Sequence, residues 1–122
     1  MRLETTHTLD LTATTNARSV TADVDVPAWA KSLAVYVGAA GGWGTGTPAV
    51  VSIERRGRGV SGWAAFSPAA TATGTGGATA VADDLNVARA SQVRARTSTA
   101  GVTGSIDTDA SVTFVFSDEE VN

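Results

Sequence analysis

The sequence predicts an all-β fold, a single antiparallel β-sandwich of seven to eight short strands. Composition is the first reason, because 22 of the 122 residues are Ala, 18 are Thr, 15 are Val and 13 are Gly, whereas only five are Leu. Threonine and valine favour the pleated surface of a sheet, and glycine favours turns. The second reason is an apolar–polar alternation of period two, in segments spaced roughly 8 to 15 residues apart. Jelly-roll and immunoglobulin-like arrangements both fit this pattern.

The length is that of one compact domain, which we place at residues 1–122. No apolar stretch approaches the roughly 20 residues of a membrane span, and the first residues contain no apolar signal core, so we expect a soluble chain without a targeting segment or a membrane partner. A net charge of −3 argues against nucleic-acid binding, which needs clustered Lys and Arg. The lack of cysteine excludes a disulfide framework, a thiolate metal site and a cysteine nucleophile.

The first half of the chain contains three expected strands. The clearest is Val20 to Val26, where apolar residues alternate with polar ones. An earlier strand is expected near residues 7–13. Pro27 should end the second strand, because proline has no backbone N–H to donate to a ladder. The segment from Ser32 to Val37 is apolar on both faces, which predicts a central strand.

The second half contains four more. Ala49 to Arg55 and Val60 to Phe66 are expected to form an antiparallel hairpin around the turn Arg56-Gly57-Arg58-Gly59. Gln92 to Ser98 and Ala110 to Ser117 alternate strictly and complete the set. Residues 83–88 fit either a helical turn or an extended segment. The predicted core includes Leu11, Val24, Leu33, Val35, Ile53, Val93, Phe114 and Phe116.

Two glycine-rich segments are expected to be long loops. Residues 38–48 contain five glycines, and residues 67–80 are an Ala/Thr run with three more, so that at most one weak edge strand is expected there. Loops of this length in a small domain are usually functional or disordered. Of the three tryptophans, Trp29 and Trp63 are expected to be part of the core, and Trp43 to be an exposed contact residue.

The sequence offers no enzyme signature, so we expect no catalytic residues and no cofactor. His7 is the only histidine and has no carboxylate beside it in the sequence, so a Ser-His-Asp triad is not favoured. Asp83 and Asp84 could converge with Asp107 and Asp109 around calcium. The EF-hand spacing is absent, however, and turn-forming aspartates explain the same residues, so no metal site is predicted.

A binding role is more consistent with the sequence than a catalytic one. Arg55, Arg56 and Arg58 form the main basic cluster of an acidic chain and could pair with an acidic partner surface, although a solvated hairpin tip is the alternative. Trp43 and Pro48 are apolar residues of a glycine-rich loop, where they could anchor a partner. These five residues are the predicted partner-binding residues.

Four segments define the layout of the chain: the alternating strand Val20–Val26, the strand Ser32–Val37, the hairpin Val50–Phe66 and the closing pair 92–96 and 111–116. This layout resembles that of the small all-β virion proteins of tailed bacteriophages. The resemblance is to head decoration and minor capsid proteins. It implies a non-enzymatic structural protein that is made in the host cytoplasm and binds the outer surface of the head. Its partners would be the major capsid protein or other virion subunits, with a trimer as a possible homo-oligomer. The alternatives are a carbohydrate-binding or host-attachment module, and a tail or neck component.

Overall fold

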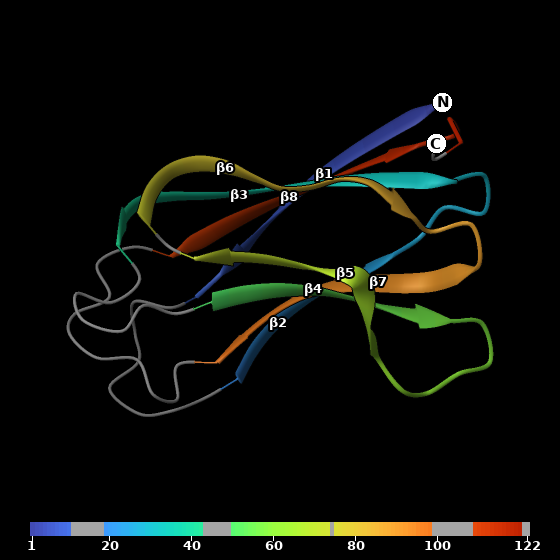
Figure 1. Cartoon of the computed structure of the whole chain (residues 1–122), viewed down its shortest axis with the longest axis horizontal. Coiled ribbons are helices and arrows are strands. Elements are labelled where there is room, and N and C mark those ends of the chain that lie inside the picture. The colour runs from blue at the N-terminus through green and yellow to red at the C-terminus, as the bar shows by residue number, and fades with distance from the viewer. Residues whose placement is uncertain (11–18, 43–49, 74, 99–108, 121–122) are drawn as a thin grey trace.

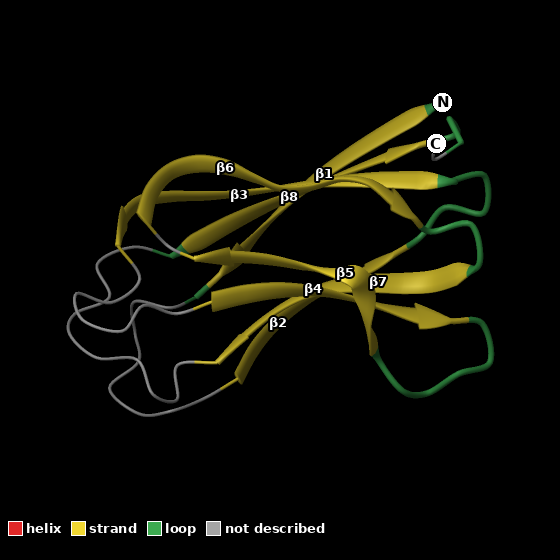
Figure 2. Cartoon of the chain, in the orientation of Figure 1, coloured by secondary structure: helices red, strands yellow, loops and turns green. Residues whose placement is uncertain are grey.

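The computed structural model of the chain describes residues 1–10, 19–42, 50–73, 75–98 and 109–120. These residues form eight β-strands in two four-stranded antiparallel sheets, which face each other as the layers of a sandwich (Figures 1 and 2). The predicted all-β class is therefore confirmed. The strands are β1 (Arg2–Leu9), β2 (Ser19–Asp25), β3 (Ser32–Gly42), β4 (Val50–Gly57), β5 (Ala64–Thr73), β6 (Thr75–Asn86), β7 (Ala90–Ser98) and β8 (Ala110–Ser117).

The strand order identifies the sandwich as a jelly roll. One sheet, here called the β1 sheet, has the order β1-β8-β3-β6, and the other, the β2 sheet, has the order β2-β7-β4-β5. The chain therefore pairs with itself as a ribbon folded at the β4–β5 connection, because β1 pairs with β8, β2 with β7, β3 with β6 and β4 with β5. Successive strand pairs belong to opposite sheets, which is the double-sheet arrangement of a jelly roll.

Alternate side chains of each inner strand fill the space between the sheets. On β8, Ala110, Val112, Phe114 and Phe116 are all fully buried, whereas Ser111 is exposed. The same alternation buries Val93 and Ala95 on β7, as expected for strands with one face toward a core. Of the predicted core residues, those confirmed as buried are Leu33, Val35, Ile53, Val93, Phe114 and Phe116.

The two glycine-rich loop predictions are wrong within the described residues. β3 does not end at Val37 but continues to Gly42, and most of residues 67–80 belong to the strands β5 and β6. Main-chain hydrogen bonds explain the difference, because they require no particular side chain. β6 pairs with β3 along its length, with register shifts at three places, and irregular pairing of this kind tolerates glycine.

Several boundaries also differ from the sequence prediction. β1 begins at Arg2 rather than near residue 7, and residues 11–18, including Leu11, lie outside the described part of the chain. Val24 is partly buried and packs against the core. The return strand of the hairpin begins at Ala64 rather than at Val60. Residues 83–86, left open between helix and strand, belong to β6.

Three tight turns lie at one end of the sandwich, which connect β2 to β3, β6 to β7 and β4 to β5 (Figure 1). In the first turn the amide of Ala30 donates to the carbonyl of Pro27 at 2.9 Å, and in the second the amide of Ala90 donates to the carbonyl of Val87 at 3.0 Å. In the third turn, Val60 N donates to Gly57 O at 3.2 Å, with Gly59 at φ 74°. Glycine adopts this left-handed conformation at little cost, which explains the Gly-Arg-Gly sequence of the turn.

The two ends of the described chain meet at the same end of the β1 sheet (Figure 1). The amino group of Met1 lies 2.9 Å from Asp118 Oδ2, and the amide of Asp118 donates to the carbonyl of Met1 at 3.3 Å. The hydrogen bond from the amino group lowers the pKa of Asp118. A lowered pKa means that this contact stabilises the fold above the ordinary pKa of an aspartate and is lost as the pH falls through the folded-state value.

We expect Phe114→Ala to lower the free energy of unfolding by roughly 3 to 5 kcal/mol, because the ring is fully buried in the middle of β8 and its removal leaves a cavity. Urea denaturation followed by far-ultraviolet circular dichroism measures the change. Val115→Ala is the control on the adjacent, half-buried position, where a smaller loss is expected. A loss below about 1 kcal/mol for Phe114→Ala would contradict the assignment of this face to the core.

Candidate functional site

Arginines gather on the β2 sheet, toward the end that carries the tight turns. The arginine cluster consists of Arg55 and Arg56 on β4, Arg58 and Arg89 in the turns that follow β4 and β6, and Arg94 and Arg96 on β7. The register brings them together, because Glu54 lies opposite Arg94, Arg56 opposite Gln92 and Gly57 opposite Ala90. These six residues include most of the nine cations of the sequence.

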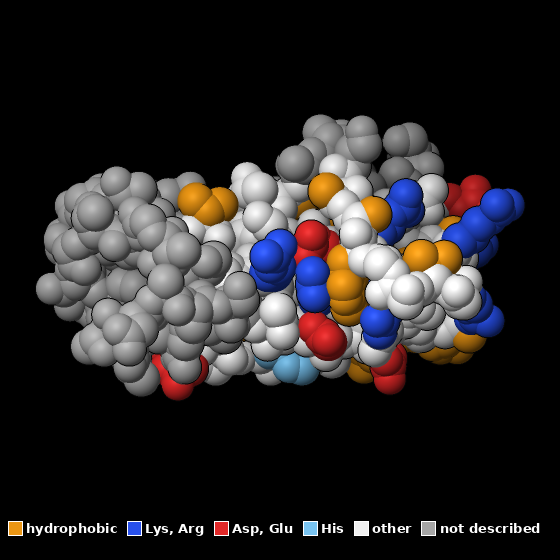
Figure 3. Space-filling model, turned by 90° about the horizontal axis from the view of Figure 1, so that it is seen from below, with side chains coloured by type: hydrophobic (Ala, Val, Ile, Leu, Met, Phe, Trp, Pro, Cys, Tyr) orange, Lys and Arg blue, Asp and Glu red, His pale blue; other side chains and the backbone are white. Residues whose placement is uncertain are grey.

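Trp63 lies at the centre of the cluster, on the outer face of the β2 sheet. The guanidinium carbons of Arg56 and Arg94 lie 4.6 and 4.4 Å from the centroid of its ring. Figure 3 shows this face, with basic and acidic side chains gathered around a hydrophobic one. Each arginine within this distance of an aromatic face is attracted by its quadrupole, by about 0.5–1 kcal/mol at an exposed site. Trp63 therefore fixes two guanidinium groups in place and holds its own loop against the sheet.

An ion pair beneath the ring orients one of these arginines. Arg94 Nε donates to Glu54 Oε1 at 2.8 Å, and the two side chains are only 18% and 17% exposed. A short, charge-assisted hydrogen bond of this kind is roughly twice as strong as a neutral one. Because both partners are largely shielded from water, removal of one would leave the other charge poorly compensated. The pair therefore holds Arg94 flat against the sheet and under Trp63.

Arg55 points to the other side of β4, where it crosses toward the β1 sheet. Its guanidinium carbon lies 5.5 Å from the centroid of Phe66, and Nη1 donates to the carbonyl of Asn86 at 3.3 Å. Arg55 thus bridges β4, β5 and the end of β6. Arg58 and Arg89 are exposed at the turns beside it, and within the described residues neither side chain makes a hydrogen bond or an ion pair.

The acidic residues on this face are concentrated at one edge. Asp23 and Asp25 are exposed on β2, and Asp25 Oδ1 accepts a hydrogen bond from Gln92 Nε2 at 2.9 Å. In the register, Asp23 lies opposite Arg94. The face therefore changes from acidic at the β2 edge to basic over β4 and the turns. A partner that matched it would present carboxylates to the β4 side.

Three of the five predicted partner-binding residues lie at the end of β4 and in the turn that follows it, with Arg56 against Trp63, Arg55 on the other side of the strand and Arg58 exposed in the turn. The site also contains residues that the sequence did not single out. Trp43 and Pro48 lie outside the described residues. Trp63 is not a core residue within a strand, as predicted, but half-buried on the outer face just before β5. Arg94 is one of the residues that the sequence did not single out. Because it lies about forty residues from Arg56, only the β4–β7 register could reveal that the two share one aromatic ring.

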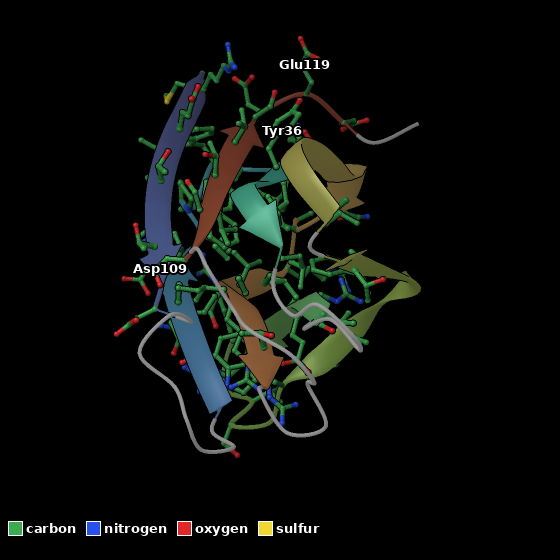
Figure 4. The ribbon with its side chains drawn as sticks, turned by 90° about the vertical axis from the view of Figure 1, so that its left-hand side faces the viewer. Tyr36, Asp109 and Glu119 are labelled. Carbon is green, nitrogen blue, oxygen red and sulfur yellow. The ribbon has the colours of Figure 1, made fainter. Side chains whose placement is uncertain are left out.

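The outer face of the β1 sheet is different in kind. Tyr36 is 43% exposed there and lies across from Thr113, which in turn lies opposite Thr6 (Figure 4). The hydroxyl groups of Thr6 and Thr113 are 3.0 Å apart. Short polar and apolar side chains surround the tyrosine on β8 and β3, with Ala34, Gly38, Ser111 and Val115 at the neighbouring outward positions. This row has no charged side chain next to the tyrosine.

His7, the one histidine of the sequence, lies on β1 beside Thr5 and Phe114. His7 Nε2 lies 3.2 Å from Thr5 Oγ1, and the ring meets Phe114 edge-on at a centroid distance of 5.8 Å, so its contacts are those of a packed side chain. Within the described ranges, no group of three or more His, Asp or Glu side chains could hold a metal ion. Asp107 of the calcium hypothesis lies outside them. The same part of the chain contains no helix that is long and apolar enough to cross a membrane.

Comparisons of the chain with family models, with curated proteins and with solved structures found no match. Function therefore has to be argued from the surfaces described above, since a sandwich fold supports many unrelated activities.

We expect Trp63→Ala to destabilise the protein by about 2 kcal/mol, because it removes two cation–π contacts and the apolar surface that the ring covers. Trp63→Phe should keep most of the stability, because it retains an aromatic face. Val60→Ala, at an exposed position of the same loop, serves as the control and should have little effect. Equal losses for Trp63→Ala and Val60→Ala in chemical denaturation would show that the arginine contacts contribute nothing.

We also expect calcium chelation to leave the melting temperature unchanged, because a ligand that binds only the folded state would raise it. Differential scanning calorimetry with and without a chelator measures this. A drop of several degrees on chelation would indicate a bound ion and direct attention to Asp107 and Asp109.

Proposed function

We propose that the chain is a non-enzymatic structural protein of a tailed-phage particle, which decorates the outer surface of the head by binding the major capsid protein. The arginine cluster around Trp63 is the observation that supports this proposal best. It is a basic surface on a chain with a net charge of −3, and it is oriented in advance by the stack and the ion pair. Arginine and tryptophan are enriched among the residues that dominate binding energies at protein interfaces.

The architecture is compatible with this role. Jelly rolls are common among viral capsid proteins and among lectins, so the strand order agrees with the leading proposal and with its alternative. A small domain that binds through a preorganised surface loses little conformational entropy on docking. Repetition of the site over a capsid lattice would let contacts that are weak individually reinforce the shell.

The alternative is a carbohydrate-binding or host-attachment module, and Tyr36 is the observation that favours it. An exposed aromatic ring among short hydroxyl-bearing side chains offers a face for stacking on a sugar and donors for its hydroxyl groups. Tyr36→Ala should abolish glycan binding if this alternative holds. It should leave capsid binding through the β2 sheet unchanged.

Binding to heads from a phage that lacks this gene tests the leading proposal. We expect the protein to co-sediment with such heads at low salt, and the Arg58→Glu/Arg89→Glu variant to bind at least about tenfold more weakly, because both exposed arginines would face an acidic partner. The loss should shrink at high salt, since exposed charges are screened over about 10 Å at 0.1 M.

A matched control separates the site from overall charge. Lys31→Glu reverses one charge, as the single variant Arg89→Glu does, at an exposed position that pairs with Glu120, and it should bind as the wild type does. Equal weakening by Lys31→Glu and Arg89→Glu would reject the arginine cluster as the site. Absence of binding by the wild type at low salt, or a gene with no virion genes beside it, would reject the head-decoration proposal itself.

A further inference from the structure

β1 is an edge strand without a bulge or a proline, and the two charges on its outer face, Arg2 and Glu4, are of opposite sign. Natural edges are protected by bulges, prolines or charges that discourage a neighbouring strand. β5 and β6 have irregular registers, and β2 carries Asp23 and Asp25 on its outer face. β1 instead pairs with β8 over eight consecutive residues without a register shift, and no other described strand pairs with it. Figure 4 shows it as the outermost strand of its sheet.

One hydrogen bond shows which backbone N–H and C=O groups of β1 point toward β8 and which point away from it. The amide of Asp118 donates to the carbonyl of Met1, so Met1 and Asp118 form a hydrogen-bonded pair of the antiparallel ladder. Hydrogen-bonded and non-hydrogen-bonded pairs alternate, so the odd-numbered residues of β1 bond to β8. The backbone N–H and C=O groups of Arg2, Glu4, Thr6 and Thr8 therefore point away from β8, to the open edge.

A second copy of β1 can satisfy these groups in an antiparallel arrangement. Hydrogen bonding then requires even-numbered residues to lie opposite even-numbered residues, and the two-fold symmetry leaves a small set of registers. With Glu4 opposite its own copy, or with Glu4 opposite Asp10 of the copy, two carboxylates would meet. With Thr6 opposite its own copy, Arg2 lies opposite Asp10 of the copy, twice in the dimer. The register centred on Leu3 also pairs opposite charges, Arg2 with Glu4 of the copy, but it overlaps only residues 1–5, whereas the Thr6 register overlaps residues 2–10.

The same register improves packing on the inner face. Leu3 lies on the side of β1 that faces the other sheet, yet it is 41% exposed. It would lie opposite Leu9 of the second copy, whose side chain is already buried, so the backbone of the added strand would cover part of the surface of Leu3. Asp10 has a contact within its own chain as well, but a carboxylate offers about four acceptor sites and can accept a further bond from a guanidinium.

We propose that the chain forms a two-fold dimer through antiparallel pairing of β1 with β1 of a second copy, with Thr6 at the symmetry axis and Arg2 bound to Asp10 of the partner copy. The dimer extends the β1 sheet from four strands to eight. It uses a different surface from the arginine cluster and does not rest on the proposed function.

Sedimentation velocity over a concentration series from about 1 µM to about 1 mM tests the association. The wild type should show a monomer–dimer equilibrium. Thr6→Pro removes an N–H that points to the open edge, so it should abolish the dimer while the ladder with β8 remains. Thr21→Pro is the matched control, because Thr21 is an exposed residue of edge strand β2 whose N–H also points away from its neighbour. It should dimerise as the wild type does.

Cysteine cross-linking tests the register and does not depend on the proline variants folding. The chain has no cysteine of its own. Thr6→Cys places two sulfurs opposite each other in a hydrogen-bonded pair, where the Cα atoms of antiparallel strands are about 5.5 Å apart, a separation that suits a disulfide. Mild oxidation should give a covalent dimer. Thr8→Cys, which would lie opposite Glu4 of the copy, and Thr21→Cys on β2 should remain monomeric.

Charge reversal supplies an independent measurement. Arg2→Glu should raise the dissociation constant at least about fivefold, and Arg2→Glu/Asp10→Arg should restore dimerisation, because the opposite charges are exchanged between the strands. A wild type that is monomeric throughout the series, or that forms a trimer, would overturn the proposal. So would equal disulfide formation by Thr6→Cys and Thr8→Cys.

Discussion

The β1 sheet depends on the four fully buried side chains of β8. This strand lies between β1 and β3, so the positions of Val112, Phe114 and Phe116 fix the register of both neighbours. Only three phenylalanines occur in the chain, and two of them are here. The rest of the core is built mostly from Val and Ala, whose burial contributes less per residue. The two rings of β8 therefore carry much of the apolar burial that holds one sheet against the other.

The strands with a side-chain alternation could be predicted from the sequence, and those without one could not. β8 was predicted with its observed bounds, and β2 and β7 to within about two residues, because burial of one face imposes a period of two on the sequence. β6 was missed because its Ala, Gly and Thr residues show no such pattern. Its pairing with β3 is specified by the ribbon topology and by main-chain hydrogen bonds. Neither of these can be read from a single segment.

The candidate site could be predicted from the sequence only in part, because only some of its residues are close together in the chain. Three of its arginines are consecutive or nearly so, and the sequence showed them as one cluster. Trp63 and Arg94 join it only through the β4–β7 register and the loop that returns to β5. The expectation that a tryptophan in a hairpin would be buried failed because its ring is covered by guanidinium groups rather than by the core. Contacts between residues distant in sequence decided the chemistry of this surface.

The two proposed surfaces would act together because of the symmetry of the edge pairing. Antiparallel strands in one sheet are related by a two-fold axis perpendicular to the sheet, so each copy keeps its β2 sheet on the same side of the dimer. Both arginine clusters then face in one direction, toward a single underlying surface. Binding of the first cluster would hold the second close to the surface, which raises its effective concentration and makes dissociation slower than from a single site. A chain with a thin core and modest charge contacts could in this way remain attached to a lattice that each monomer would bind only weakly.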